Sequence, residues 1–304
     1  MNTIVAVPFD SALAEHIGKR GSENSITFYN RKIGNDTVVA LMPTSIEEKF
    51  YALPESLLLA GQVVVSTASV DKLLGEVLVA CSLLHKRVLL TDDNDISSLL
   101  EGLSLEATVV SRDSILDALL AYQPDNSPTS AARIDIDKAF NVKGVGTVAL
   151  GIVTSGTVRV HDTLYHGSGK MVAVRSIQSQ DEDIPAAEKG TRVGLALKGI
   201  DENELEKGDV LSSTHMAQTK RLRLRIRTSS IANESIAVGK TYSIAAGFAY
   251  SNATVEEANS NTITLRLEKG ISVAENDTVL ITREAAPRIF AIGTAEKISD
   301  TAPL

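Results

Sequence analysis

The apolar pattern of this 304-residue chain changes at one place, and that change limits the folds available to it. Before about residue 122, short β-branched runs such as "TIVAVPF", "GQVVVST" and "EATVVS" alternate with helical patterns at about 71–85, 94–103 and 112–122. Strands that alternate with helices are typical of a parallel sheet. We therefore expect residues 1–124 to form an α/β domain with a mostly parallel sheet.

After the stretch "QPDNSPTS", which predicts a linker, the runs become short and alternating and are separated by Gly-bearing turns. This texture is typical of all-β barrels or sandwiches. A second break at "SSTHMAQT" divides the region, so we expect two β-barrel domains, at 129–214 and 218–298. Within the first domain, "SITFYNRKIGNDTVVALM" predicts a hairpin that turns at residues 33–36.

The composition excludes several classes of protein. The longest apolar stretches, such as "LLLAGQVVV", are far shorter than the roughly 18–20 residues of a membrane span, and the first residues lack a basic signal region. The single cysteine, Cys81, lies in a helical pattern and is expected to be a small buried residue. We expect a cytoplasmic protein with neither a membrane nor DNA as its partner. The net charge of −8 belongs almost wholly to the first domain, where residues 1–124 hold 9 Lys and Arg against 16 Asp and Glu.

The segment "AEHIGKRGS" at 14–22 is a poor match to a phosphate-binding loop. That loop needs the pattern G-x-x-x-x-G-K-[ST] between a strand and the helix that follows it. Here Lys19 is followed by Arg20, the hydroxyl arrives late at Ser22, and no glycine precedes Gly18. The segment also follows a helical pattern instead of opening one. We expect Gly18 to end that helix as its C-cap and the residues after it to form a loop. The five histidines lack metal-binding spacing, and no metal site is expected.

Residues 140–211 resemble a known domain along their whole length. The motifs are "FNVKGVGTVALG" at the start, "GTRVGLALKGI" in the centre and "ENELEKGDVL" at the end. In this order they resemble the second, β-barrel domain of the translational GTPases, the elongation factor Tu family. "GSENSITFYN" and "VRSIQSQDEDI" look most like the archaeal SelB-like branch, which includes the factor named EF-Pyl.

The resemblance implies that the first domain is a GTPase domain, and its nucleotide elements are degenerate. "PFDSALAEH" stands in the place of the phosphate-binding loop, "MPTS" in the place of D-x-x-G, and "TDDND" in the place of N-K-x-D. The residues left for a vestigial nucleotide site are Lys19, Asp92 and Asp95. We therefore expect a pseudo-GTPase that has lost GTP and Mg²⁺, holds no cofactor and is not an enzyme.

In the family, the second domain holds the aminoacylated 3′ end of tRNA. Carried over by motif, the pocket residues are Asp137, Lys138, Phe140, Thr147 and Arg192. Phe140 suits base stacking and Thr147 a hydroxyl contact, whereas Arg192 resembles the arginine of the selenocysteine factor and suits a charged or polar aminoacyl group. The alternatives are barrel core for Phe140 and a solvated rim charge for Arg192.

The segment "KRLRLRIRT" at 220–228 places four arginines on one face of a strand, Arg221, Arg223, Arg225 and Arg227. Side chains on one face repeat every ~6.6–6.8 Å, close to the spacing of successive phosphates along RNA. The row therefore predicts RNA binding that weakens as salt rises. The alternatives are a face neutralised by nearby acids and a docking surface for the acidic first domain.

Three functions follow from these features. The first is an elongation-factor-like protein that has lost GTP binding and hydrolysis and binds tRNA or another RNA through its barrels, with the ribosome or translation proteins as further partners. The second is a protein–protein scaffold or regulator that keeps the three-domain shape without RNA binding. The third, which the three degenerate elements disfavour, is an active GTPase with a rebuilt site around Lys19.

Overall fold

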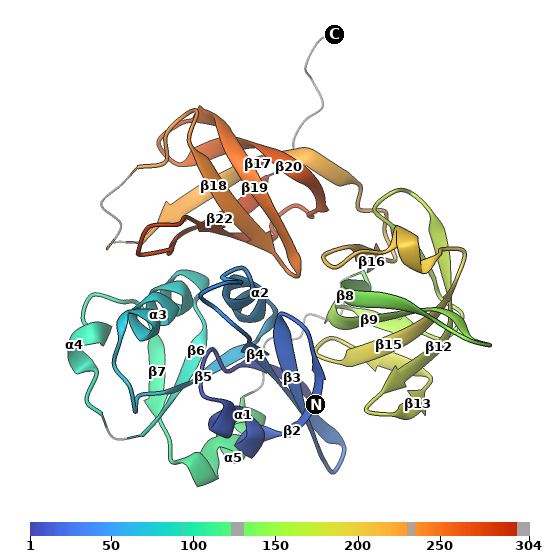
Figure 1. The fold of residues 1–304 in the computed structure, drawn as a ribbon, viewed down its shortest axis with the longest axis horizontal. Helices are drawn as coiled ribbons and strands as arrows, with labels where there is room; N and C mark the ends of the chain where they lie inside the picture. Colours follow the sequence, from blue (N-terminus) through green and yellow to red (C-terminus); the bar gives the residue numbers. More distant parts are fainter. Residues whose placement is uncertain (93, 123–130, 230, 232–234, 297–304) are drawn as a thin grey trace.

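The computed structural model describes residues 1–92, 94–122, 131–229, 231 and 235–296. It contains a mixed-sheet domain followed by two β-barrels (Figure 1). In Figure 1 the first domain lies at the lower left, the first barrel at the right and the second barrel across the top, so that each domain borders the other two. The expected fold class, an α/β domain with a mostly parallel sheet followed by two β-barrel domains, is confirmed.

The first domain is a seven-stranded sheet in the order β2-β3-β4-β1-β5-β6-β7. Its strands are β1 (Asn2–Ala6), β2 (Lys19–Glu23), β3 (Ile26–Ile33), β4 (Asp36–Pro43), β5 (Gln62–Ser66), β6 (Arg87–Thr91) and β7 (Glu106–Val109). Its helices are α1 (Ser11–Ile17), α2 (Ala52–Leu59), α3 (Lys72–Leu84), α4 (Ser97–Leu100), the 3₁₀ turn η1 (Arg112–Ser114) and α5 (Ile115–Ala121). The strands from β4 through β1, β5 and β6 to β7 are parallel, whereas β2 and β3 add an antiparallel edge.

The second domain closes through six strands, in the order β11-β16-β8-β9-β15-β12 with β12 pairing back to β11. Its elements are β8 (Arg133–Val142), β9 (Gly146–Ser155), β10 (Thr157–Arg159), β11 (Thr163–His166), β12 (Met171–Ser179), β13 (Glu182–Ile184), β14 (Ala186–Glu188), β15 (Arg192–Lys198), η2 (Glu202–Glu204) and β16 (Val210–Ser212). The third domain is a closed barrel in the order β17-β20-β19-β18-β21-β22. Its strands are β17 (Gln218–Thr228), β18 (Thr241–Ala246), β19 (Ala249–Ala258), β20 (Thr262–Ser272), β21 (Thr278–Thr282) and β22 (Ile289–Glu296).

The domain limits remain predictions in part. The expected boundaries at 124, 129 and 298, and the linker 123–130, lie outside the described residues. Between the barrels, β16 ends at Ser212 and β17 begins at Gln218. The predicted hairpin is confirmed as β3 and β4, and Gly34 in its turn has a φ of 59°. Helix α2 was not predicted.

The predicted loop after Gly18 is wrong, because Lys19–Glu23 forms the edge strand β2 and pairs with β3. Gly18 does follow α1, but its backbone is extended instead of left-handed. A Cβ at Gly18 would lie 2.9 Å from the backbone nitrogen of Asn30. Glycine therefore serves here for the close approach of two strands, and not for a left-handed turn.

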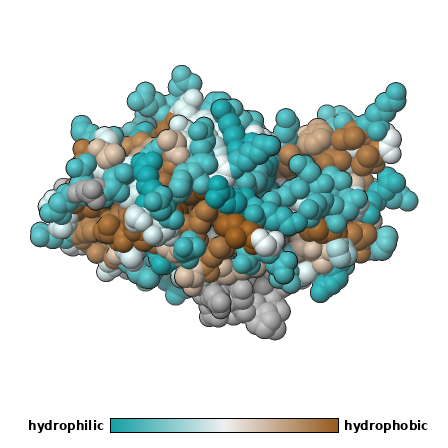
Figure 2. Space-filling model, turned by 90° about the horizontal axis from the view of Figure 1, so that it is seen from below, coloured by the Kyte–Doolittle hydropathy of each residue, from teal (hydrophilic) through white to brown (hydrophobic). Residues whose placement is uncertain are grey.

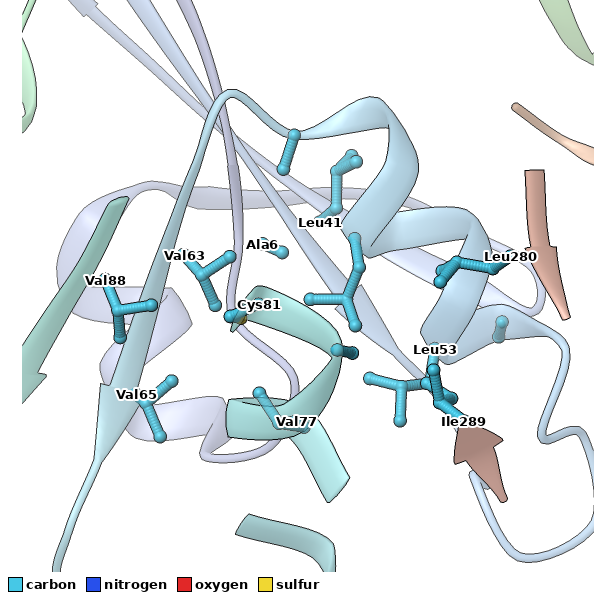
Figure 3. Packing of buried hydrophobic residues seen from close by; sticks show 14 of the residues in the cluster. Ala6, Leu41, Leu53, Val63, Val65, Val77, Cys81, Val88, Leu280 and Ile289 are labelled. Atoms are coloured by element: carbon cyan, nitrogen blue, oxygen red, sulfur yellow. The ribbon is translucent and has the colours of Figure 1, made fainter. Parts of the chain in front are cut away.

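One hydrophobic cluster crosses the domain boundaries. It is built on the first domain, where Cys81 is fully buried close to Ala6 and Val63. It also includes residues of both barrels, Ile152, Ala245, Phe248, Leu280 and Ile289. Figure 3 shows Leu280 and Ile289 of the third domain beside Leu53 on α2. The contacts between domains are therefore part of the molecule's interior.

The face of the molecule seen from below is mainly polar. Figure 2 shows hydrophilic residues over most of the face seen from below, with hydrophobic residues visible in separate areas between them. Among the helices of the described part, none is long and apolar enough to pass through a membrane.

Candidate functional site

Two of the segments that we interpret as degenerate nucleotide elements meet at the carboxyl end of the parallel sheet. In α/β sheets ligands bind at the carboxyl ends of the strands, at the point where the strand order reverses on either side of the first strand. Here Pro8–Ser11, after β1, and Met42–Ser45, at the end of β4 and just after it, line one cavity of about 520 Å³. The charged side chains that line it are Asp10, Glu47 and Glu48, all acidic.

A network of ion pairs lies at this carboxyl end of the sheet. Asp10 is the N-cap of α1, where one carboxylate oxygen accepts from the backbone of Leu13 at 2.9 Å. Its other oxygen accepts from Arg112 at 2.9 Å, and Arg112 also pairs with Asp92 at 3.3 Å. The Ser66 hydroxyl donates to Asp92 at 2.6 Å. This hydrogen bond is the largest cause that lowers the pKa of Asp92, and the hydrogen bond from Arg112 is the second.

The structure does not bring the three vestigial residues together. Asp92 belongs to the ion-pair network just described, whereas Asp95 accepts from the backbone and hydroxyl of Ser97 at the start of α4. Lys19 follows the far end of α1, on β2, and lines a different cavity. The described residues hold no group of three His, Cys, Asp or Glu side chains suited to a metal ion.

Arg192 lies at the junction of the first two domains. Its guanidinium carbon is 3.5 Å from the centre of the Phe28 ring, and it donates to the Ser22 hydroxyl at 2.6 Å. Only 13% of its side chain is exposed, so the alternative of a solvated rim charge is wrong. Burial lowers the pKa of Arg192 to about 10, partly offset by Asp137 at 4.0 Å. Burial likewise raises the pKa of Asp137.

Arg192 opens onto a cavity of about 490 Å³ between β2 and the first barrel. Lys19 and Arg20 line it from the first domain, and Gln178, Asp181 and Arg192 line it from the barrel. Three cations and one carboxylate therefore surround this space. It is suited to an anionic or strongly polar group, because arginine and lysine donate hydrogen bonds and accept none.

The other predicted pocket residues differ in their exposure to solvent. The Thr147 hydroxyl is buried and donates to the carbonyl oxygen of Ile200 at 2.9 Å. Phe140 is half-buried, with the Lys138 ammonium 6.0 Å from its ring centre. Thr147 thus has a structural partner within the barrel, while Lys138 and Phe140 share an accessible surface.

The four arginines of β17 each have a partner. Arg221 pairs with Glu256 and Glu257 at 3.0 and 3.2 Å, and Arg223 pairs with Glu296 at 3.1 Å.

The other two arginines of the row reach different parts of the molecule. Arg225 lies 3.8 Å from Glu296, whereas Arg227 donates to His85 and to the carbonyl of Leu83 in the first domain. The neutralising acids therefore come from β19 and β22 of the same barrel. Arg227 alone among the four docks on the first domain within the described residues.

Sequence reasoning missed the point where all three domains meet. Lys207, after η2, donates to Glu55 on α2 at 2.5 Å and to the Ser25 hydroxyl at 2.6 Å. Its ammonium also lies 5.1 and 5.7 Å from the ring centres of Tyr51 and Phe248. Burial raises the pKa of Glu55 to about 7, against the opposing effect of Lys207.

Comparison with known proteins agrees with this architecture. Residues 146–212 match the family model of elongation factor Tu domain 2. The structure of translation elongation factor SelB from Methanococcus maripaludis, in complex with the GTP analogue GppNHp, superposes with a TM-score of 0.83. The identity is 18%, and the match covers 99% of this chain and 80% of SelB. The fold and the second domain together define a relative of the translational GTPases, in a SelB-like arrangement.

Two archaeal sequences are also similar. Elongation factor 1-alpha of Methanocaldococcus jannaschii is 35% identical over 98 residues, which are 32% of this chain and 23% of that protein. The uncharacterized protein MJ0325 of the same organism is 32% identical over 292 residues, covering 92% of this chain and 95% of that protein. The chain belongs to the same family as MJ0325.

Proposed function

We propose that this chain is a nucleotide-independent relative of the elongation factors that binds tRNA or another RNA through its barrels, in the cytoplasm. The observation that carries the proposal is the arginine row on β17. Although paired, Arg221, Arg223 and Arg225 keep 46–58% of their side chains exposed. Exposed ion pairs contribute only about 0–1 kcal/mol each, so a polyanion can compete for these arginines.

The cavity beside Arg192 gives further support. It joins three cations from two domains, and exposed Lys138 with half-buried Phe140 lies on the same barrel. Aromatic and arginine side chains are the groups on which single-stranded RNA bases stack. An RNA end with a polar or anionic group fits this chemistry, and the ribosome or translation proteins would then be further partners.

The loss of GTP binding is supported by the charges at the carboxyl end of the sheet. A triphosphate there would meet the carboxylates of Asp10, Glu47 and Glu48. The helix end that would receive a phosphate is already capped by Asp10, and Arg112 is held between Asp10 and Asp92. Like charges a few ångströms apart repel strongly near a protein surface. These residues do not fit a nucleoside triphosphate with Mg²⁺, and we infer no hydrolysis.

The RNA proposal is tested by titrating the protein with unfractionated tRNA at about 50 and 200 mM salt. The triple variant Arg221→Ala, Arg223→Ala, Arg225→Ala is expected to weaken binding at least tenfold and to reduce the salt dependence. The double variant Lys49→Ala, Lys72→Ala, which removes exposed lysines of the first domain, is expected to bind like the unaltered chain. Absence of binding at low salt contradicts the proposal.

The nucleotide part is tested separately, by calorimetric titration with GTP and GDP in the presence of Mg²⁺. We expect no binding up to millimolar nucleotide. Micromolar binding of GTP or GDP would mean that the carboxyl end of the sheet holds a different phosphate site. It would then support the third function, an active GTPase.

A scaffold or regulator without RNA binding is the second candidate function. It is favoured by one observation, that every arginine of the row has a partner within the chain. If neither the triple variant nor the unaltered chain binds RNA, the scaffold or regulator replaces the RNA-binding protein as the proposed function.

A further inference from the structure

A cavity of about 350 Å³ lies between the first two domains, at the end of the sheet opposite the ion-pair network. It is lined by the start of β1, the end of α2 with the residues that lead to β5, and the last part of β9. Its apolar walls come from Ile4, Leu58, Leu59, Tyr122, Ile152 and Val153. The volume is at the lower end of the range of about 300–1,000 Å³ that is usual for small-molecule sites.

One amine stands in this apolar setting. Lys86 lines the cavity. Its backbone is fixed at the end of α3, because His85 before it has a left-handed conformation and the Lys86 backbone nitrogen donates to the Cys81 carbonyl at 2.9 Å. Its Nζ donates to the carbonyl of Ala60. Among the described residues no carboxylate lies within ion-pair distance of Nζ, so two of its three donors are left for a ligand.

The charges around the cavity set the charge of its ligand. The Met1 ammonium is paired with Asp36, which leaves Lys86, Lys189 and Glu188. Among the described lining residues, two cations and one anion leave a single positive charge, which suits a monoanion better than a phosphate dianion. Burial, with a smaller contribution from Lys189, lowers the pKa of Lys86 to about 8. The Cys81 thiol beneath it is neutral, because burial raises its pKa to about 12.

We propose that this cavity binds a small organic carboxylate with an apolar body, whose carboxylate pairs with Lys86. The apolar body lies against Leu58, Leu59 and Ile152, and the two free N–H groups of Lys86 donate to the carboxylate. A buried charge without a counterion is costly, so a bound anion stabilises the amine in its charged form. This site is separate from the arginine row and does not depend on RNA binding.

The experiment is calorimetric titration of the whole chain at pH 7 with octanoate and 3-phenylpropionate, with octanamide and inorganic phosphate as comparison probes. We expect at least one carboxylate to bind and both comparison probes to fail. Lys86→Met is expected to weaken the carboxylate at least tenfold. Lys49→Met removes an exposed lysine of the same domain and is expected to change nothing.

The pH dependence of carboxylate binding is a second measurement, and it can be made on the unaltered, folded protein. With a pKa of about 8 for Lys86, the protonated fraction falls about tenfold between pH 7 and 9, and carboxylate affinity falls with it. Lys86→Arg stays charged over this range, so its affinity is expected to stay constant. An equal fall in Lys86→Arg would assign the effect to another group. That result overturns the proposal, as does equal binding of octanamide or no binding of either carboxylate at about 1 mM.

Discussion

Replacing Lys207 by methionine tests the electrostatics of the three-domain junction. The ammonium is the charged partner of Glu55, whose residue is 1% exposed. Methionine keeps most of the side-chain volume, so the change removes mainly the charge, with its hydrogen bonds and its cation–π contacts with Tyr51 and Phe248. Glu55 then has no cation within ion-pair distance among the described residues.

The expected size follows from the pKa of Glu55. In the folded chain it is raised from 4.5 to about 7, so the folded state prefers the protonated form. The contribution of Glu55 to stability is therefore greatest below pH 4.5, falls as the pH rises to about 7 and is constant above it. Without Lys207 the pKa rises further, and the fall continues above pH 7 at about 1.4 kcal/mol per pH unit. For each unit by which the loss of Lys207 raises this pKa, the stability lost above pH 7 is about 1.4 kcal/mol.

The assay is urea unfolding followed by far-ultraviolet circular dichroism at pH 7, 8 and 9. The double variant Lys207→Met, Glu55→Gln removes the titrating group, and its stability is expected to vary with pH like that of the unaltered chain. Lys170→Met breaks the exposed pair with Glu204 and serves as the matched lysine control. Parallel stability curves for Lys207→Met and the unaltered chain between pH 7 and 9 would refute the reasoning.

Three further changes have expected outcomes. Arg288→Met leaves Glu76, 6% exposed, without its guanidinium and should cost roughly 3–5 kcal/mol in urea unfolding, whereas Arg223→Met, in an exposed pair, should cost at most about 1 kcal/mol. Gly247→Ala should lower Tm far more than Gly34→Ala, because both have a φ near 58–59° but the new Cβ at 247 would lie 2.1 Å from an Asp135 carboxylate oxygen and that at 34 meets open space; equal shifts would contradict this. Cys81 should resist a thiol reagent in the native protein at pH 8 and react at the rate of unfolding, since burial raises its thiol pKa to about 12.

The fold was predictable because its patterns are local. Alternation with a period of two gives strands, and the hairpin turn at Gly34 is encoded within the segment itself. Strand β2 was missed because its five residues, "KRGSE", are all exposed and carry no apolar alternation. Only its pairing with β3 makes it a strand. Helix α2 was missed because its buried face includes the polar residues Glu55 and Ser56, which a binary apolar pattern does not register.

The candidate sites were predictable only where a motif marks them. The motif located Arg192, but not Phe28 beneath its guanidinium, because the two lie on different domains. The partners of Lys207 and Arg112 are equally remote, since Glu55 is 152 residues from Lys207 and Asp10 is 102 residues from Arg112. The acids facing the arginine row lie on other strands of the barrel, so a strand read alone shows four arginines without a counterion.

The hydrophobic cluster shared by the three domains determines how the molecule comes apart. Leu280 and Ile289 of the third domain are covered on one side by the first domain. A fragment that lacks either of these two domains would therefore expose a new apolar surface to water. Opening one interface therefore exposes the interior of two domains at once. Amide hydrogens in α2 and in β21 should then exchange with solvent through one shared opening event, at a common rate. A protease that cuts only in such openings would degrade the chain as a single unit.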